Sequence, residues 1–339
     1  MFSRNSRMIL RKCQLLSAGK NRWLSSTTTK AEEDPAPLFF SKDIQELLKI
    51  LTRPDPKKVF RTRKDGHPIE DPTYKFMTDE ELQASLQKAE QDLQQRLQMP
   101  PVVKERSPIT DIVSKDPAIQ GNDGSKYIFT DITFGVNDLN RLIVARDPDG
   151  TLRKASWDER FRMNQIYFPV EGREMFTPKM FQDEQIQAIL ERKDYEFILD
   201  RACTQFEPDD PEYQRITRLV YDAVDSQNDY DTLRSTRHYG PFLFHLVVTK
   251  NIDNLLYENI TREFIEDAAL LVKLFHKIHE TSQCDEVSRI ENNMEVIQKY
   301  IDSDAPKKGK LNSAINAYKE LVKTRETVAE AVKKAHGLD

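Results

Sequence analysis

The strongest constraint on the fold of this chain is a long run of apolar residues at helical spacing in its C-terminal third. Between Ile252 and Glu280 the recurring apolar positions are Leu256, Ile260, Phe264, Ala268, Leu271, Phe275 and Ile278. Residues three and four apart lie on one face of an α-helix, so this pattern predicts a single helix over 252–280. Because that face is apolar, it has to pack against other elements, and we expect the surrounding region to be helical too.

Capping signals predict further helices closer to the N-terminus. Thr78 and Glu81 form a capping box, in which each side chain accepts a hydrogen bond from the backbone amide of the other residue. The helix that they begin should end near Gln98, just before two prolines. Its narrow leucine stripe runs between polar residues, so we expect another protein to cover it. Asp210 followed by Pro211 favours the start of another helix.

Residues 126–154 have a different character, that of short β-strands. Residues 126–134 and 141–146 are rich in aromatic and β-branched side chains, and 151–154 make a third, shorter strand. The turn at 147–150 has Pro at its second position and Gly at its fourth. The chain is therefore predicted to be mainly α with a small β-meander (α+β), an elongated fold in which helical segments flank a short antiparallel sheet.

The stretch 151–169 interleaves basic and aromatic side chains, a pattern that is typical of nucleic-acid binding. Ser156 and Glu159 form a second capping box, so a helix should begin there and end before the next proline. Trp157 and Phe161 lie four residues apart and share one face of that helix. We expect these two rings to be buried together against the meander rather than to stack on bases.

Basic residues gather in three clusters that are candidates for contact with RNA phosphates. The first cluster comprises Arg53, Lys57, Lys58, Arg61, Arg63 and Lys64, the second Arg234 and Arg237, and the third Arg153 and Arg160. An extended positive segment can follow a phosphate backbone by charge alone. The alternative is that these side chains are merely solvated, and the sequence leaves both interpretations open. In the third cluster, both arginines are expected to be exposed.

The charge of the chain is divided unevenly. The whole sequence has 51 basic and 56 acidic residues, a net charge of −5. Residues 1–24 carry +6 with no acidic residue, so the remainder carries −11. An Arg-rich, acid-free N-terminus is typical of a mitochondrial presequence, with the mature chain beginning near Ser25; the alternative is a basic tail. An acidic chain with local basic clusters suits a component that touches RNA on one side and basic proteins on the other.

These observations divide the chain into six segments. They are a presequence (1–24), a flexible linker (25–40), a helical and extended region (41–125), the β-meander with its capped helix (126–170), a helical region (171–305), and a linker with a C-terminal helix (306–339). None of the apolar runs is long enough to span a bilayer, so no membrane contact is expected.

The sequence contains no recognisable catalytic site. It has no GxxxxGK[ST] or GxGxxG phosphate-binding loop, no GxSxG and no HExxH. The only metal-like spacing joins His276, His279 and Cys284, and a zinc site would need a distant fourth ligand such as Cys203 or His245. Burial of the two histidines at the border of a helical face explains this spacing more simply. We therefore expect no enzyme, no cofactor and no small-molecule substrate.

Several segments, in the same order, closely resemble one known family. They are TYKFMTDEELQ, LQMPPVVKERSPITDIV, KYIFTDITFGV, TLRKASWDERFRMNQIYFPVEGRE and QFEPDDPEYQRI, and the resemblance covers about residues 40–280. The chain resembles the family of the mitochondrial small ribosomal subunit protein numbered twenty-two, which has no bacterial counterpart. The resemblance implies a structural, non-catalytic protein of the mitochondrial matrix, with mitochondrial ribosomal proteins and the small-subunit rRNA as partners.

Two other functions are compatible with the residues alone. A free matrix assembly factor for the small subunit would bind immature particles and leave complete ones. An enzyme of unknown type would need a site that none of the motifs above supplies. Association with complete small subunits would distinguish the structural role from both.

Overall fold

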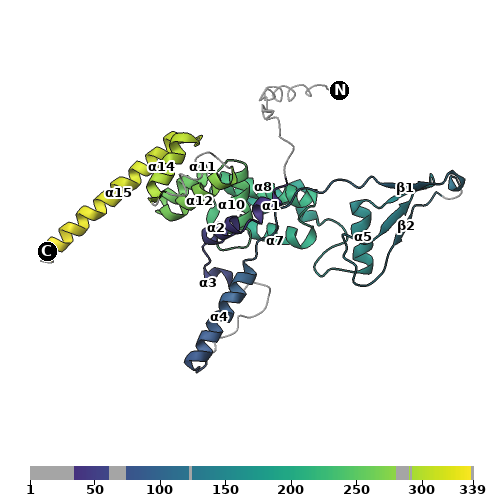
Figure 1. Ribbon diagram of the computed structural model, residues 1–339, viewed down its shortest axis with the longest axis horizontal. Coiled ribbons are helices and arrows are strands. Elements are labelled where there is room, and N and C mark those ends of the chain that lie inside the picture. Colours follow the sequence, from purple (N-terminus) through teal and green to yellow (C-terminus); the bar gives the residue numbers. More distant parts are fainter. Residues whose placement is uncertain (1–33, 61–73, 122–123, 280–289, 291, 337–339) are drawn as a thin grey trace, which may run out of the picture. The chain divides into compact units, whose positions relative to one another are not determined.

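Fourteen α-helices and one four-stranded sheet form the regular structure of the described residues (Figure 1). The computed structural model describes residues 34–60, 74–121, 124–279, 290 and 292–336. The α-helices are α1 (Ala36–Phe39), α2 (Lys42–Thr52), α3 (Pro56–Val59), α4 (Asp79–Arg96), α5 (Trp157–Tyr167), α6 (Asp183–Glu191), α7 (Tyr195–Gln205), α8 (Pro211–Gln227), α9 (Tyr230–Leu233), α10 (Tyr239–Val248), α11 (Asp253–Thr261), α12 (Ile265–Ile278), α14 (Asn293–Ser303) and α15 (Lys308–Ala335). The expected mainly helical fold with a small sheet is confirmed. None of the described helices is both long and apolar enough to cross a membrane.

A helical core is built from α1, α2, α6 to α12, α14 and the start of α15. Helix α10 supplies its most apolar segment, and every residue from Tyr239 to Phe244 is buried. The ring of Phe39 on α1 meets that of Phe244 edge to face, with 5.2 Å between centroids. Full burial of an aromatic or aliphatic side chain contributes about 1.5–3 kcal/mol, so this core supplies most of the hydrophobic stabilisation.

The predicted helix over 252–280 is wrong in one respect, because the structure divides it into α11 and α12. Glu263 adopts a left-handed backbone conformation with φ +65°. Its amide donates to the carbonyl of Ile260 at 3.1 Å, and the amide of Phe264 donates to that of Asn259 at 2.8 Å. These bonds close the end of α11, and the chain then begins α12 in a new direction. Glu280 lies outside the described residues.

The sheet has the strand order β1-β4-β3-β2 and is antiparallel throughout. Its strands are β1 (Ile112–Lys115), β2 (Tyr127–Thr130), β3 (Ile143–Arg146) and β4 (Thr151–Lys154). The expected meander of β2, β3 and β4 is therefore confirmed, whereas β1 lies outside the predicted sheet region. The turn between β3 and β4 is closed by a bond of 3.0 Å from the amide of Gly150 to the carbonyl of Asp147.

Both predicted capping boxes are present. Thr78 and Glu81 begin α4, and Ser156 and Glu159 begin α5. Asp210 accepts a bond from the amide of Glu212 at the start of α8, as its sequence signal predicts. Such local signals act within a single turn, so tertiary packing does not have to be known.

Two predicted linkers contain helical structure where the structure describes them. The last residues of the segment 25–40 form α1, whose Phe39 is buried in the core. Helix α15 begins at Lys308, inside the linker predicted just before the C-terminal helix. Each short helix start is anchored by burial rather than by a capping sequence, since neither has a capping side chain. Residues 1–33, including the predicted presequence, lie outside the described residues.

Candidate functional site

Arg160 was expected to be exposed for phosphate, and the structure contradicts this. Its side chain is 7 % exposed on the face of α5 that lies toward the β2–β3 loop. Its Nη2 donates to the carbonyls of Asp138, Leu139 and Arg141 at 3.0, 3.0 and 2.8 Å. A guanidinium presents several donors in a fixed plane, so one side chain can satisfy carbonyls that would otherwise be buried without a partner.

Arg141 holds the other half of the same loop, and the sequence gave no reason to single it out. Its guanidinium donates to the carbonyls of Asp131, Thr133 and Val136 at 2.9, 3.0 and 2.8 Å. It also lies over the ring of Phe168, 3.8 Å from the centroid. Together the two arginines fix the loop between β2 and β3. For Arg160 a signal was available, because it lies three residues after Trp157 on the inward face of a capped helix.

Arg153 is not exposed either, since it belongs to an ion-pair cluster at the start of α5. It pairs with Asp147 at 2.8 Å and with Glu159 at 2.8 Å, and Lys126 pairs with Glu159 at 2.9 Å. Hydrogen bonds from Arg153 hold the pKa of Glu159 well below its ordinary value. The same bonds raise the pKa of Arg153, so both groups stay charged at neutral pH. The Glu159 carboxylate thus caps α5 and ties it to the sheet.

The expected burial of Trp157 together with Phe161 is wrong, because both side chains are only half-buried. The indole Nε1 donates to the carbonyl of Ser107 at 2.8 Å. The guanidinium of Arg106 lies 4.6 Å from the centroid of the Trp157 ring, and Arg106 also pairs with Asp210 at the start of α8. Trp157 therefore packs on the chain that leads from the helical core rather than inside the sheet.

The second basic cluster is also used inside the fold. Arg234 is 8 % exposed and donates to Asn259 Oδ1 at 2.7 Å. Arg237 pairs with Asp200 at 2.7 Å, and the Nε2 of His238 lies 2.9 Å from the same carboxylate. Burial lowers the pKa of His238 below its ordinary value. These side chains join α7 to the start of α10 and are structural.

The first basic cluster divides between internal and exposed residues. The Nε of Arg53 pairs with Asp267 at 2.6 Å, and its guanidinium lies 3.9 Å from the centroid of Phe264. Lys58 Nζ donates to backbone carbonyls at the end of α9, with a bond of 2.7 Å to Asp231. Among the described candidates only Lys57 has an exposed side chain. The remaining candidates, Arg61, Arg63 and Lys64, lie outside the described residues.

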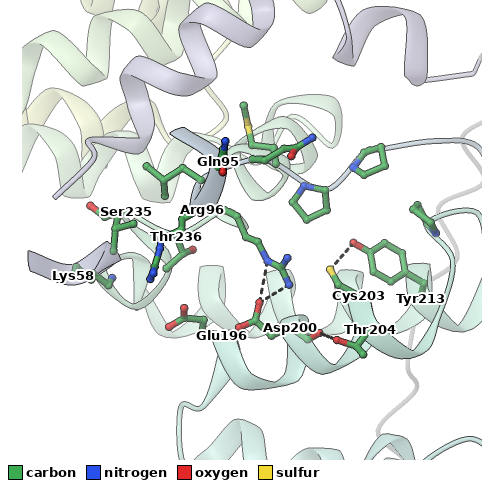
Figure 2. Close-up of a pocket in the computed structure, with 18 of the residues that line it drawn as sticks. Lys58, Gln95, Arg96, Glu196, Asp200, Cys203, Thr204, Tyr213, Ser235 and Thr236 are labelled. Atoms are coloured by element: carbon green, nitrogen blue, oxygen red, sulfur yellow. Dashed lines mark hydrogen bonds and ion pairs between the residues drawn. The ribbon is translucent and has the colours of Figure 1, made fainter. Parts of the chain in front are cut away.

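A pocket of about 910 Å³ lies between α3, the end of α4, α7 and the residues before α10 (Figure 2). Figure 2 shows Asp200, Cys203 and Thr204 projecting from α7, with Cys203 directed toward Tyr213 at 3.5 Å. Burial raises the pKa of the Cys203 thiol, so it stays protonated and is a poor nucleophile. The carboxylate of Asp200 is already occupied by Arg237. This arrangement gives the pocket a structural character rather than a catalytic one.

The histidines of the metal-like spacing lie on α12 as expected for a buried helical face. His276 is 1 % exposed, and the Nε2 of His279 lies 2.8 Å from the carbonyl of Val247. Cys284, the third residue of that spacing, lies outside the described residues. Within the part of the chain that the structure describes, no three His, Cys, Asp or Glu side chains gather as they would around a metal ion.

Exposed apolar side chains are concentrated on the sheet, α5 and their loops, residues 112–176, which we call the sheet module. Half of the exposed large hydrophobic side chains among the described residues belong to it, and Phe134 and Phe176 are 94 % and 68 % exposed. Leu82 and Leu86 on α4 are 49 % and 61 % exposed, as the predicted uncovered stripe requires. Apolar surface of this extent marks contact with another macromolecule.

Comparison with known proteins identifies the family. The family model described as mitochondrial 28S ribosomal protein S22 matches residues 37–280. The chain is 36% identical to the mouse small ribosomal subunit protein mS22 over 313 residues, covering 91% of this chain and 87% of the mouse protein. It is 37% identical to the bovine protein of the same name over 286 residues, covering 84% and 79%. The chain therefore belongs to the mitochondrial 28S ribosomal protein S22 family.

Proposed function

We propose that this protein is a structural component of the small subunit of the mitochondrial ribosome, in the mitochondrial matrix, where it supports translation without catalysing a reaction. The observation that carries the proposal is the family match over residues 37–280. It is supported by two mammalian relatives that bear the name of a small ribosomal subunit protein. The internal use of the polar clusters agrees with a structural role, because their charges are committed to holding the fold.

Protein partners are proposed to cover the exposed apolar surfaces. On α4 these are Leu82 and Leu86, which lie four residues apart on one face. Acidic residues follow the N-cap of this helix, and Asp79, Glu80 and Glu81 fill its first turn. A basic neighbouring ribosomal protein with an apolar face fits both features.

Contacts with the small-subunit rRNA are proposed through exposed lysines. Lys57 is the described residue of the first basic cluster that remains exposed. Helix α15 has seven basic and three acidic residues, and Lys319, Lys323, Lys333 and Lys334 on it are exposed. Positive charge in an otherwise acidic chain is thereby available where it is not paired internally.

The test is sedimentation of mitochondrial lysate through a gradient. The protein should travel with complete small subunits in a one-to-one ratio and stay bound at moderate salt. Lys57→Glu combined with Lys323→Glu should weaken incorporation more than Lys42→Glu, an exposed lysine on α2 that serves as the control. Presence only on precursor particles would support the alternative, a free assembly factor, and presence only at the top of the gradient would exclude both.

A further inference from the structure

The sheet has one face that α5 does not cover. Antiparallel pairing sets Tyr127 opposite Arg146, Phe129 opposite Val144, and Val144 opposite Lys154. Because side chains alternate along a strand, these residues share one face, and their neighbours in sequence share the other. The open face presents Ser114, Tyr127, Phe129, Val144, Arg146, Leu152 and Lys154. The opposite face carries the buried Ile143 and Ala145 and the Arg153 that pairs with α5.

The two aromatic rings of this open face are available to a ligand. Tyr127 is 49 % exposed and Phe129 is 56 % exposed. They are two residues apart on β2, so they lie about 6.8 Å apart along the strand. β2 is an edge strand, and its partner β3 lies on one side only (Figure 1). Each ring therefore offers a flat surface on which one flat group can stack.

The charges of the open face are both positive. Arg146 donates one bond of 3.1 Å to the carbonyl of Gly150, and its Nε and Nη2 have no hydrogen bond within the described residues. Lys154 pairs with Asp111 at 2.6 Å, but these side chains are 49 % and 62 % exposed. An ion pair that is so exposed contributes about 0–1 kcal/mol and exchanges readily for another anion. None of the seven residues of the face is acidic.

We propose that the open face binds an unpaired stretch of RNA, with bases stacked on Tyr127 and Phe129 and phosphates held by Arg146 and Lys154. Aromatic rings on an open sheet face with cations beside them are how several sheet proteins hold single-stranded RNA. A duplex has its bases stacked inside and offers none to these rings. The inference rests on the proposed ribosomal function for the source of the RNA, and it assigns a surface that differs from the three basic clusters.

An extended protein segment added to the edge of β2 is the competing occupant. The edge amides and carbonyls of Ile128 and Thr130 point away from β3, because those of Tyr127 and Phe129 take part in the ladder. However, a protein strand would gain little from the two cations, whereas a phosphate chain is attracted by both. The observations thus favour RNA, and the experiment below separates the two.

The test measures binding of a short fluorescein-labelled oligouridine to the chain that begins at Ser25, by fluorescence anisotropy. Tyr127→Leu with Phe129→Leu keeps apolar area but removes the stacking rings, and it should weaken binding by about tenfold or more. Phe134→Leu with Phe176→Leu removes two exposed rings outside the face and should leave affinity unchanged. Arg146→Gln and Lys154→Gln should each lower the log–log salt slope by about 0.7. Far-UV circular dichroism verifies that every variant is folded.

Three results would overturn the inference. They are affinity for oligouridine that the Tyr127 and Phe129 variant retains, a preference for duplex RNA of the same length, and no binding of oligouridine at all. In the last case, loss of incorporation by Tyr127→Asp with Phe129→Asp would assign the face to a protein partner. A negative binding result with intact co-sedimentation contradicts only this inference, and binding without co-sedimentation contradicts only the proposed function.

Discussion

Arg160 shows at the scale of one residue how this chain uses positive charge. Its three bonds to backbone carbonyls of the β2–β3 loop replace water that burial excludes. Arg141, Arg153 and Arg234 have comparable internal partners. A basic side chain in this family is therefore not evidence of RNA contact unless its exposure is known. The acidic net charge is a related consequence, because many of the cations serve the fold.

Arg160→Leu should lower the free energy of unfolding of the sheet module by about 1–3 kcal/mol. The substitution leaves buried carbonyls without a donor, and an unsatisfied buried polar group costs this amount. Urea unfolding followed by Trp157 fluorescence measures the change. Arg162→Leu on the same helix is the control, because Arg162 is exposed, and it should have little effect. Equal stability of the two variants would show that the carbonyl contacts contribute nothing.

Glu159 makes the sheet module sensitive to acid. Its pKa is depressed in the folded state by Arg153, so its contribution is complete above its unfolded pKa of about 4.3 and is lost as pH falls toward the lower folded pKa. Glu159→Gln keeps the capping geometry and removes the charge. The stability difference between wild type and this variant should be largest at neutral pH and shrink below about pH 4.3.

Urea unfolding at a series of pH values, again followed by Trp157 fluorescence, measures that difference. The control is Asp158→Asn, which removes an exposed carboxylate of the same helical turn. A difference that does not change with pH would contradict an electrostatic origin.

At the scale of elements, β1 joins the sheet through a contact that only glycine allows. Gly150 has φ +84°, and a Cβ there would overlap with the carbonyl oxygen of Asp116, the residue after β1. The amide of Asp116 in turn donates to the carbonyl of Gly150 at 3.0 Å. The β3–β4 turn therefore also positions β1.

Gly150→Ala should destabilise the sheet module more than Gly135→Ala. Both glycines have φ +84°, so both substitutions introduce backbone strain of about 1 kcal/mol, but nothing lies within 4 Å of a Cβ at Gly135. The difference between them measures the clash with β1. Hydrogen exchange should show faster exchange of the β1 amides in the Gly150 variant only. The same exchange rate in both variants would mean that β1 tolerates the displacement.

Elements with local signals were predictable and those set by distant contacts were not. The capping boxes at Thr78 and Ser156 and the turn at Gly150 are complete within a few residues. The end of α11 has no such signal, because Glu263 takes a conformation that glycine normally supplies. Likewise, the partners of Arg160 lie about twenty residues away, and β1 depends on pairing with β4 across a long separation. Periodicity alone cannot show either contact.

At the scale of the whole molecule, the sheet module and the helical core are separate in their apolar packing. The core cluster contains no described residue between Leu51 and Phe181. Polar bonds join the two instead, among them Arg173 to Glu207 at 2.9 Å and Arg201 to Glu174 at 2.5 Å. Within the sheet module few apolar side chains are fully buried, chiefly Ile143, Ala145 and Ala155. Its isolated stability should therefore be small.

Urea should unfold the chain in two steps. Trp157, the one tryptophan of the chain from Ser25 onward, reports on the sheet module, and far-UV circular dichroism reports mainly on the helical core. The fluorescence midpoint should lie at lower urea, because the module buries less apolar surface per residue. Coincident midpoints would show that the polar bonds couple the two into one cooperative unit.

The thin burial of the sheet module also has a meaning for the life of the protein in the cell. A copy without its neighbours exposes aromatic side chains such as Phe134 and Phe176, together with a free strand edge. Chaperones and proteases recognise surfaces of this kind, and assembly would cover them. Under the proposed function, unassembled copies should have short half-lives, so that the abundance of this chain follows the abundance of its partners rather than its own rate of synthesis.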